Sequence, residues 1–162
     1  MLLACDLLRA FHRPEPMQTF TEQNFDELGF HDCHVHGWGI AEAAEGLGTL
    51  TLDIDYITAW EQPGDGTFTF LVAPATLVFV DVYLLVLAVN YTSFCVKPFS
   101  IDGIERESYA DGYRYRIEIG EPLDSLISFC GNRFRMAFRA PPIRSTSQCL
   151  APAARVPMSY HS

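Results

Sequence analysis

Polar and apolar residues alternate with a period of two through much of this 162-residue chain. Between residues 49 and 56, Leu, Ile and Tyr alternate with Thr and Asp, and between 67 and 72 Phe and Val alternate with Thr and Leu. Because successive side chains of a strand point to opposite faces, this rhythm predicts strands with one buried face. The run Pro63-Gly64-Asp65-Gly66 between the two segments predicts a hairpin turn.

Other segments extend the same pattern. The continuous apolar content of 75–80 and 82–91 predicts strands buried on both faces, with a turn or bulge at Asp81. We expect an edge strand at 99–109, a turn at 110–112 and a strand at 113–119, and then a hairpin within 126–139 whose turn is Gly131-Asn132. The one helix that we expect is a short one after Thr21, which is suited to capping it.

These elements predict a mainly β fold, either a single antiparallel sandwich or a partly open barrel of about eight strands, with little helix. Length and composition favour one domain, which we place at residues 17–140. Residues 1–16 are interpreted as a short N-terminal arm or a mis-assigned start, because Met17 follows the break Pro14-Glu15-Pro16. The prolines after residue 140 predict an extended C-terminal tail over 141–162.

The charge of the chain is negative and unevenly distributed. The net charge of −9 opposes binding to a phosphate backbone, so we expect no nucleic-acid partner. Residues 14–96 contain twelve Asp or Glu and no Lys or Arg, whereas residues 97–162 contain nine basic and seven acidic residues. Two interpretations are open: arginine-rich strands pair with acidic strands across a sheet, or an acidic surface meets a basic partner.

Cysteine usage and hydropathy bear on location. The five cysteines are widely spaced and form no C-x-x-C pair, and no secretory leader precedes them, which predicts a reduced, cytoplasmic setting. The longest uninterrupted apolar run, residues 82–89, is far shorter than the roughly 20 residues of a membrane helix. We therefore expect no membrane partner, while the apolar strands make a homodimer plausible.

The segment FHDCHVHGW, at residues 30–38, holds three of the five histidines. On a strand, Asp32, His34 and His36 point to one face. A His-x-His pair with a carboxylate suits zinc or iron, so these residues are candidate metal ligands, although a domain of this size needs no cofactor for its stability.

Either of two aspartates on a neighbouring strand, Asp53 or Asp55, could complete such a site. In the alternative interpretation, His34 and His36 line a solvated face and Asp32 forms hydrogen bonds within the sheet or a turn. The string D-x-H-x-H also occurs in metal-dependent amidohydrolases. Those enzymes are TIM barrels of about 250 residues or more that need further ligands, so we exclude that family.

Five segments together resemble a family of uncharacterised bacterial proteins of about this length: FHDCHVH, LTLDIDYITAW, VAPATLVFVDV, YRIEI and FRAPPIRSTSQCL. The resemblance covers roughly residues 18–155, and it implies a fold but no mechanism. The opening Phe30-His31-Asp32 followed by strands is also similar to the start of several families of immunity proteins, which neutralise toxins in bacterial competition.

Two functions of different class follow. In the first, the chain is a non-catalytic interaction module, immunity-like, that presents an acidic face to a basic protein partner, with Asp53, Asp55, Tyr56 and Trp60 as candidate binding residues. In the second, it is a metal-binding protein or metal-dependent enzyme that uses the HDCHVH segment. The sequence leaves open whether the chain is an enzyme.

Overall fold

The computed structural model describes residues 17–64, 66–92 and 96–158. In these ranges the chain forms nine strands of one antiparallel sheet and three short 3-10 helices. The strands are β1 (Thr19–Thr21), β2 (Cys33–Glu42), β3 (Gly48–Glu61), β4 (Thr69–Ala88), β5 (Phe99–Tyr109), β6 (Gly112–Glu121), β7 (Leu126–Gly131), β8 (Arg133–Phe138) and β9 (Ile143–Ser145). The helices are η1 (Glu22–Glu27), η2 (Ala44–Gly46) and η3 (Pro152–Ala154). The expected N-terminal arm, residues 1–16, lies outside the described residues.

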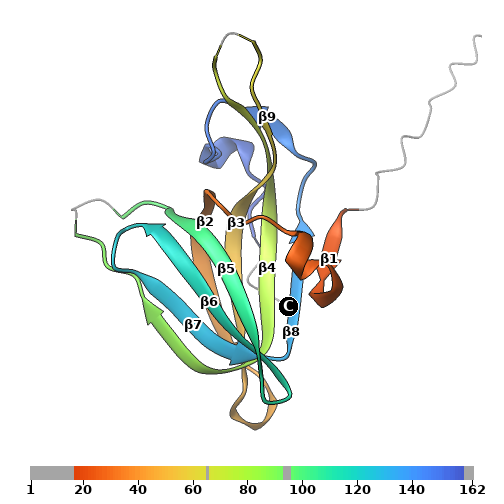
Figure 1. Ribbon diagram of the computed structural model, residues 1–162, viewed down its shortest axis with the longest axis vertical. Helices are drawn as coiled ribbons and strands as arrows, with labels where there is room; N and C mark the ends of the chain where they lie inside the picture. Colours follow the sequence, from red (N-terminus) through yellow and green to blue (C-terminus); the bar gives the residue numbers. More distant parts are fainter. Residues whose placement is uncertain (1–16, 65, 93–95, 159–162) are drawn as a thin grey trace, which may run out of the picture.

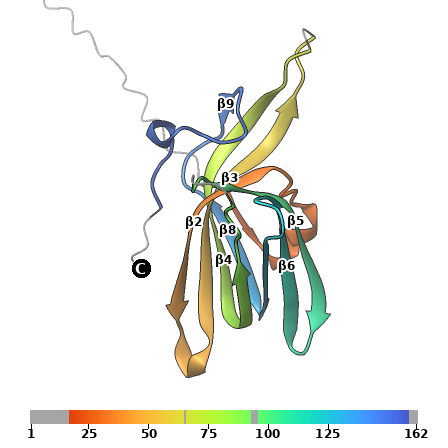
Figure 2. The ribbon, with the colours of Figure 1, turned by 90° about the vertical axis from the view of Figure 1, so that its left-hand side faces the viewer.

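The sheet curls into an incomplete ring (Figure 1). Strands pair in the order β1-β8-β4-β3-β2-β5-β6-β7, and a further pairing of β7 with β4 closes the circle. The junction of β2 with β5 is short, because only residues 33–35 and 99–101 pair there. Beyond it the β2–β3 and β5–β6 pairs diverge (Figure 2). The mainly β fold expected from the sequence is thus confirmed, in the form of a partly closed ring.

Strand β4 is the longest element and bends within its length (Figure 1). One edge of β4 pairs with β3, while residues 75–80 pair with β8 and residues 83–88 with β7. Asp81 and Leu84 adopt positive φ angles of 59° and 51° at the bend. Residues 75–80 and part of the expected 82–91 strand therefore belong to one strand, with the irregularity at Asp81 that the sequence predicts.

The predicted hairpin at Gly131-Asn132 is wrong. Strands β7 and β8 follow each other along β4, where Cys130 pairs with Tyr83 and Arg133 with Val80. Between them the Asn132 N–H donates to the Val80 carbonyl over 3.1 Å. The Gly-Asn pair adapts the chain to the bend of β4 and does not reverse its direction.

The other two turns are confirmed. The β3–β4 hairpin is closed by a hydrogen bond of 3.2 Å from the Gly66 N–H to the Pro63 carbonyl. Tyr109 pairs with Gly112 at the β5–β6 turn.

The short helix after Thr21 is present as η1, and the Thr21 N–H donates to the Asn24 Oδ1 atom over 3.3 Å. No helix among the described residues is long and apolar enough to span a membrane.

Aromatic side chains fill the inside of the ring. Phe79 is fully buried, and its ring centroid lies 4.9 Å from that of Tyr115 and 4.7 Å from that of Phe129. Helix η1 places Phe25 against Phe134, with centroids 5.0 Å apart. These edge-to-face contacts are the geometry that aromatic pairs favour, and they join η1 to the sheet.

Residues 141–158 form an extended segment that is packed against the sheet. Strand β9 pairs with the start of β4, as in the pairing of Ser145 with Phe70. Further along, Leu150 is 3% exposed and joins the hydrophobic core. The sequence analysis expected an extended tail over 141–162; the described part, residues 141–158, also contains η3 and buries Leu150 and Met158, which that expectation did not include.

Replacing Gly112 with Ala tests the close approach of β6 to the β7–β8 junction. An added Cβ would clash with Asn132 and lie 2.7 Å from the Gly131 carbonyl oxygen. We expect the free energy of unfolding, measured by urea denaturation, to fall by about 1–3 kcal/mol. In the same hairpin, a Cβ added at Gly103 meets nothing within 4 Å, so Gly103→Ala should change the free energy of unfolding by less than about 0.5 kcal/mol. Equal losses in the two variants would contradict this packing.

Candidate functional site

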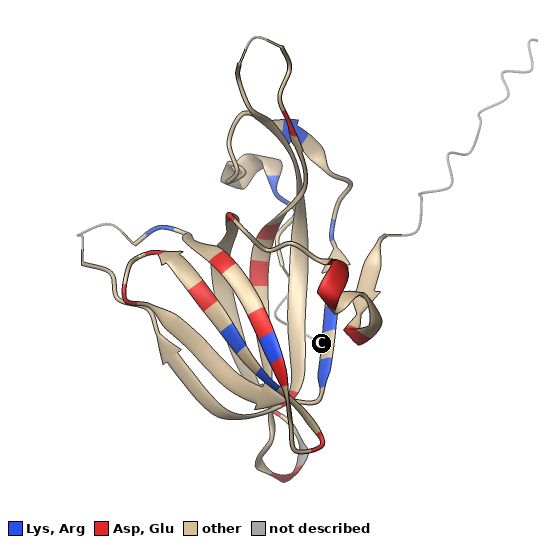
Figure 3. Ribbon diagram, viewed as in Figure 1, with Lys and Arg blue, Asp and Glu red and all other residues tan. Residues whose placement is uncertain are grey.

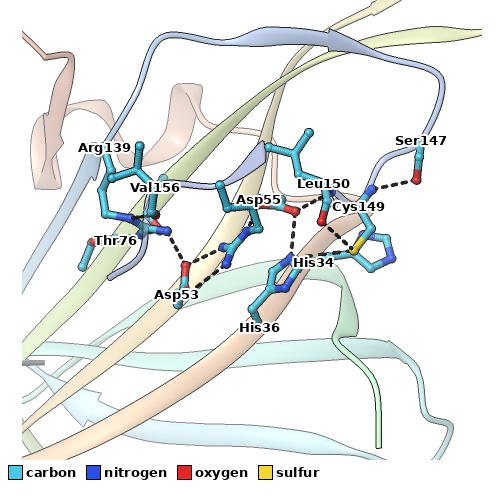
Figure 4. A network of polar contacts seen from close by, with 12 residues as sticks. His34, His36, Asp53, Asp55, Thr76, Arg139, Ser147, Cys149, Leu150 and Val156 are labelled. Carbon is cyan, nitrogen blue, oxygen red and sulfur yellow. Dashed lines mark hydrogen bonds and ion pairs between the residues drawn. The ribbon is translucent and has the colours of Figure 1, made fainter. Parts of the chain in front are cut away.

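The outer face of β2 and β3 carries a polar cluster, which the segment 147–156 covers (Figure 4). On β3, Asp53 and Asp55 point away from the core residue Ile54, as strand alternation requires. Strand β2 has an irregularity between Val35 and Gly37, so His36 is an extra residue opposite β3. The His36 ring reaches the side chain of Asp55. The backbone of Asp55 pairs with that of His34 in the β2–β3 ladder.

Two arginines from the C-terminal part of the chain neutralise the two aspartates. The Arg155 Nε–H donates to Asp55 Oδ1 over 2.8 Å, and its Nη1 and Nη2 groups donate to Asp53 over 3.1 and 2.6 Å. The Arg139 Nη2 group donates to Asp53 Oδ1 over 2.5 Å, and its Nη1 group donates to the Ala75 carbonyl. We call these four residues the Asp–Arg cluster.

The burial of the Asp–Arg cluster corrects one expectation. Asp53 is 7% exposed and Asp55 is fully buried. Their carboxylates therefore contact the chain's own arginines and present no acidic face to a partner. Tyr56 is also a core residue, with its ring 5.8 Å from those of Phe30 and Phe138, so of the four candidate binding residues only Trp60 is exposed.

The environment of the cluster favours the charged forms of Asp55 and Arg155. Burial raises the pKa of Asp55, but hydrogen bonds from His36, Arg155 and the Leu150 N–H outweigh that effect and hold the pKa below its ordinary value. For Arg155, burial lowers the pKa, and the hydrogen bonds and charges of Asp53 and Asp55 more than compensate, so the pKa is raised. The contact of Arg155 with Asp55, which helps to fix the C-terminal segment, thus favours the charged form of both groups.

A second group of side chains adjoins the Asp–Arg cluster. The His36 Nε2 atom lies 2.7 Å from Asp55 Oδ2 and 3.7 Å from the Cys149 Sγ atom (Figure 4). The group consists of His36, Asp55 and Cys149, whose ligand atoms all lie within 4.8 Å of one another. No other group of three or more His, Cys, Asp or Glu among the described residues is as close. Burial and the charge of Asp55 raise the pKa of the Cys149 thiol.

The candidate metal ligands Asp32, His34 and His36 are not brought to one point. His36 joins Asp55, one of the two aspartates expected to complete a site. His34 turns its Nδ1 atom to within 3.0 Å of the Asp32 carbonyl oxygen, while Asp32 Oδ2 accepts a hydrogen bond of 2.8 Å from Gln148. Burial lowers the pKa of His34, which favours its neutral form at neutral pH.

Asp32 and His34 instead line an acidic cleft of about 360 Å³. Its walls are Asp32, His34, Ser100, Asp102, Gly120, Glu121 and Gln148. An added Cβ at Gly120 would lie 2.6 Å from Asp102 Oδ1, so this glycine makes room for the carboxylate. The Lys97 Nζ atom is 3.6 Å from a Glu121 oxygen at the rim. The lining itself contains three carboxylates and no lysine or arginine.

Exposed rings continue the surface beside the cleft. His31 stacks on Trp60 with centroids 6.4 Å apart and an interplanar angle of 13°, and Trp60 contacts Phe68 edge to face at 6.5 Å. Trp60 and Phe68 are 48% and 51% exposed. We call these three residues the aromatic ledge. It is continuous with the cleft, because His31 Nε2 lies 3.5 Å from Asp32 Oδ2.

On β5 and β6, acidic and basic residues alternate along the strands (Figure 3). Arg114 lies 3.4 Å from Glu107 and Arg116 lies 3.1 Å from Glu118. The Arg114–Glu107 pair joins two neighbouring strands, as the interpretation of arginine-rich strands paired with acidic strands expects, whereas Arg139 and Arg155 of the Asp–Arg cluster lie outside the strands. In the acidic cleft, Glu121 lies near Lys97, whereas Asp32 and Asp102 lie near His31 and have no lysine or arginine partner among the described residues.

Comparison with models of protein families, with curated proteins and with solved structures finds no match. The resemblances drawn from the sequence segments therefore stay predictions.

The Asp–Arg cluster predicts a large loss of stability for Arg155→Ala. Removing this guanidinium leaves two buried carboxylates short of partners, and we expect the free energy of unfolding in urea to fall by about 3 kcal/mol or more. Arg144 pairs with Glu61 at the surface over 2.9 Å, and Arg144→Ala should cost less than about 1 kcal/mol. A loss for Arg155→Ala no larger than that of the control would argue against a stabilising role.

The lowered pKa of Asp55 predicts an acid-labile contribution to stability. The group's pKa is below 3.8 in the folded chain, so the unfolded chain binds the proton more tightly. The contribution is complete above the unfolded pKa and is lost as the pH falls through the folded pKa. Urea denaturation from about pH 5 downwards should therefore show a steeper loss for the wild type than for Asp55→Asn. Parallel profiles would contradict the assignment.

Proposed function

We propose that this protein is a non-catalytic interaction module that binds a basic segment of a partner protein through the acidic cleft and the aromatic ledge. The observation that carries the proposal is the continuity of the two surfaces. His31 stacks on the exposed Trp60 and reaches Asp32 in the cleft, so one binding segment can meet exposed rings together with Asp32 and Asp102, which no lysine or arginine of the described residues pairs with.

Arginine is the residue type that fits such a surface best. Its guanidinium pairs with carboxylates in a planar fork and also stacks on aromatic faces, and both kinds of contact are available here. Tryptophan and tyrosine rings are frequent anchors of protein interfaces. The excess negative charge of the chain would also speed the encounter with a basic partner at low ionic strength.

The proposal keeps the first of the two functions expected from the sequence and changes the residues that perform it. Asp32, Asp102 and Glu121 replace Asp53 and Asp55 as the acidic groups, and Trp60 is retained. An immunity-like action, in which the module occludes a basic site on a bacterial toxin inside the cytoplasm, is one form of this function. It would need no chemistry from the module, because steric and electrostatic occlusion is sufficient.

Two variants that lose the same charge test the proposal. The cleft variant carries Asp32→Asn, Asp102→Asn and Glu121→Gln, and the matched control carries Glu27→Gln, Glu42→Gln and Glu45→Gln at exposed positions outside the cleft. Trp38→Phe in both backgrounds leaves Trp60 as the single tryptophan of the chain. The probes are an arginine-rich peptide and a lysine-rich peptide of equal charge, titrated while Trp60 fluorescence is recorded.

We expect the wild type and the control to bind the arginine-rich peptide more tightly than the lysine-rich one, with an affinity that falls as salt is added. The cleft variant should bind at least about tenfold more weakly, the effect of losing one or two desolvated charge contacts. Equal affinities for the cleft variant and its control would show that net charge, and not the cleft, attracts the peptide. That result, or self-association of the chain through Trp60, would overturn the proposal.

A further inference from the structure

We propose that His36, Asp55 and Cys149 form a binding site for one divalent transition-metal ion of the zinc class. This inference goes beyond the interaction surface, because the three residues lie in the polar cluster under the segment 147–156 and do not line the acidic cleft. It also differs from the metal site expected from the sequence, with which it shares His36 and Asp55, one of the two aspartates that could complete that site, because Cys149 replaces Asp32 and His34.

One of the separations between the three ligand atoms already matches the one that a tetrahedral zinc ion imposes, and all three atoms lie within 4.8 Å of one another. With Zn–N bonds of about 2.0–2.1 Å and Zn–S bonds of about 2.3 Å, the nitrogen and sulfur ligands stand about 3.6 Å apart. His36 Nε2 and Cys149 Sγ are 3.7 Å apart. The 2.7 Å between His36 Nε2 and Asp55 Oδ2 is a direct hydrogen bond, which must open to about 3.3 Å for an ion to replace the proton.

The combination of donors favours zinc over calcium or magnesium. An imidazole nitrogen and a thiol sulfur are ligands that zinc prefers, whereas calcium and magnesium bind through oxygen. Binding deprotonates the thiol, and the released proton passes to solvent. When the metal occupies the Nε2 atom of His36, the neutral imidazole carries its single N–H proton on Nδ1.

The surroundings orient Asp55 for this role. The Arg155 Nε–H holds Oδ1, and the Leu150 N–H donates to Oδ2 over 2.7 Å, so Oδ2 is fixed toward His36. Such outer contacts commonly orient metal ligands. The positive charge of Arg155 opposes that of the ion, so we expect weaker binding than at structural sites with several thiolates.

Solvent reaches the site at His36, whose side chain is 13% exposed. This residue also lines a hollow of about 190 Å³ whose walls include Gly37, Trp38 and Phe99. We expect a water molecule as the fourth ligand. A bound ion would link β2 and β3 to the C-terminal segment, because Cys149 is 113 residues from His36 in the sequence.

The experiment uses the full chain after removal of metal with a chelator and without an affinity tag. Zinc binding is measured by competition with a chromophoric chelator, and cobalt binding by the thiolate-to-cobalt charge-transfer absorption, which reports a sulfur ligand. The test variants are His36→Gln and Cys149→Ser, and His34→Gln is the matched control on the same strand. Circular dichroism and urea denaturation without metal establish that each variant is folded.

We expect the wild type and His34→Gln to bind one equivalent of zinc and to show the cobalt–thiolate absorption. His36→Gln should bind at least about tenfold more weakly, and Cys149→Ser should lose the absorption. Zinc should also raise the Tm of the wild type, since an ion that binds only the folded chain stabilises it. Absence of zinc binding in the wild type, or retention of the cobalt–thiolate absorption in Cys149→Ser, would overturn the inference. Neither outcome affects the peptide titration, in which no metal is present.

Discussion

The hydrogen-bonding edges of β4 determine the architecture of this protein. One edge pairs with β3, while the other pairs with β8, β7 and β9. A flat strand of 20 residues could not both lie in the middle of the sheet and pair with β7 to close the ring. The positive φ angles at Asp81 and Leu84 bend the strand so that both are met. The ring, its aromatic interior and the covered outer face of β3 all depend on this bend.

Local patterns in the sequence predict the parts of this fold that depend on local geometry. Alternation identifies β3, the start of β4 and β6, and the turns at 63–66 and 110–112 follow from residues that favour tight turns. The Gly131-Asn132 pair marks an irregularity equally well, but a local signal does not reveal which strand lies opposite. Its partner is Val80, more than fifty residues earlier, and this distance is why the predicted hairpin is wrong.

The same difference between local patterns and distant partners explains which residues of the candidate site the sequence predicts. Alternation correctly places Asp53 and Asp55 on the face opposite the core, but it does not tell whether a distant segment covers that face. The excess of arginine after residue 97 was the signal that internal partners exist for the acidic residues. Cys149 had no comparable signal, because no residue around it forms a ligand motif with the FHDCHVH segment. The acidic cleft likewise combines residues from four separate parts of the chain.

The long separation between the aspartates and their arginines has a consequence for synthesis. Asp55 and Arg155 are 100 residues apart, so the ribosome produces the acidic strand well before the cation that neutralises it. During that interval the β2–β3–β4 meander can pair locally, while the carboxylates stay hydrated. Docking of the C-terminal segment must then come late, as the step that removes water from charges already positioned by the sheet. In a nascent chain this open face is the part most accessible to chaperones and to premature contacts with other chains.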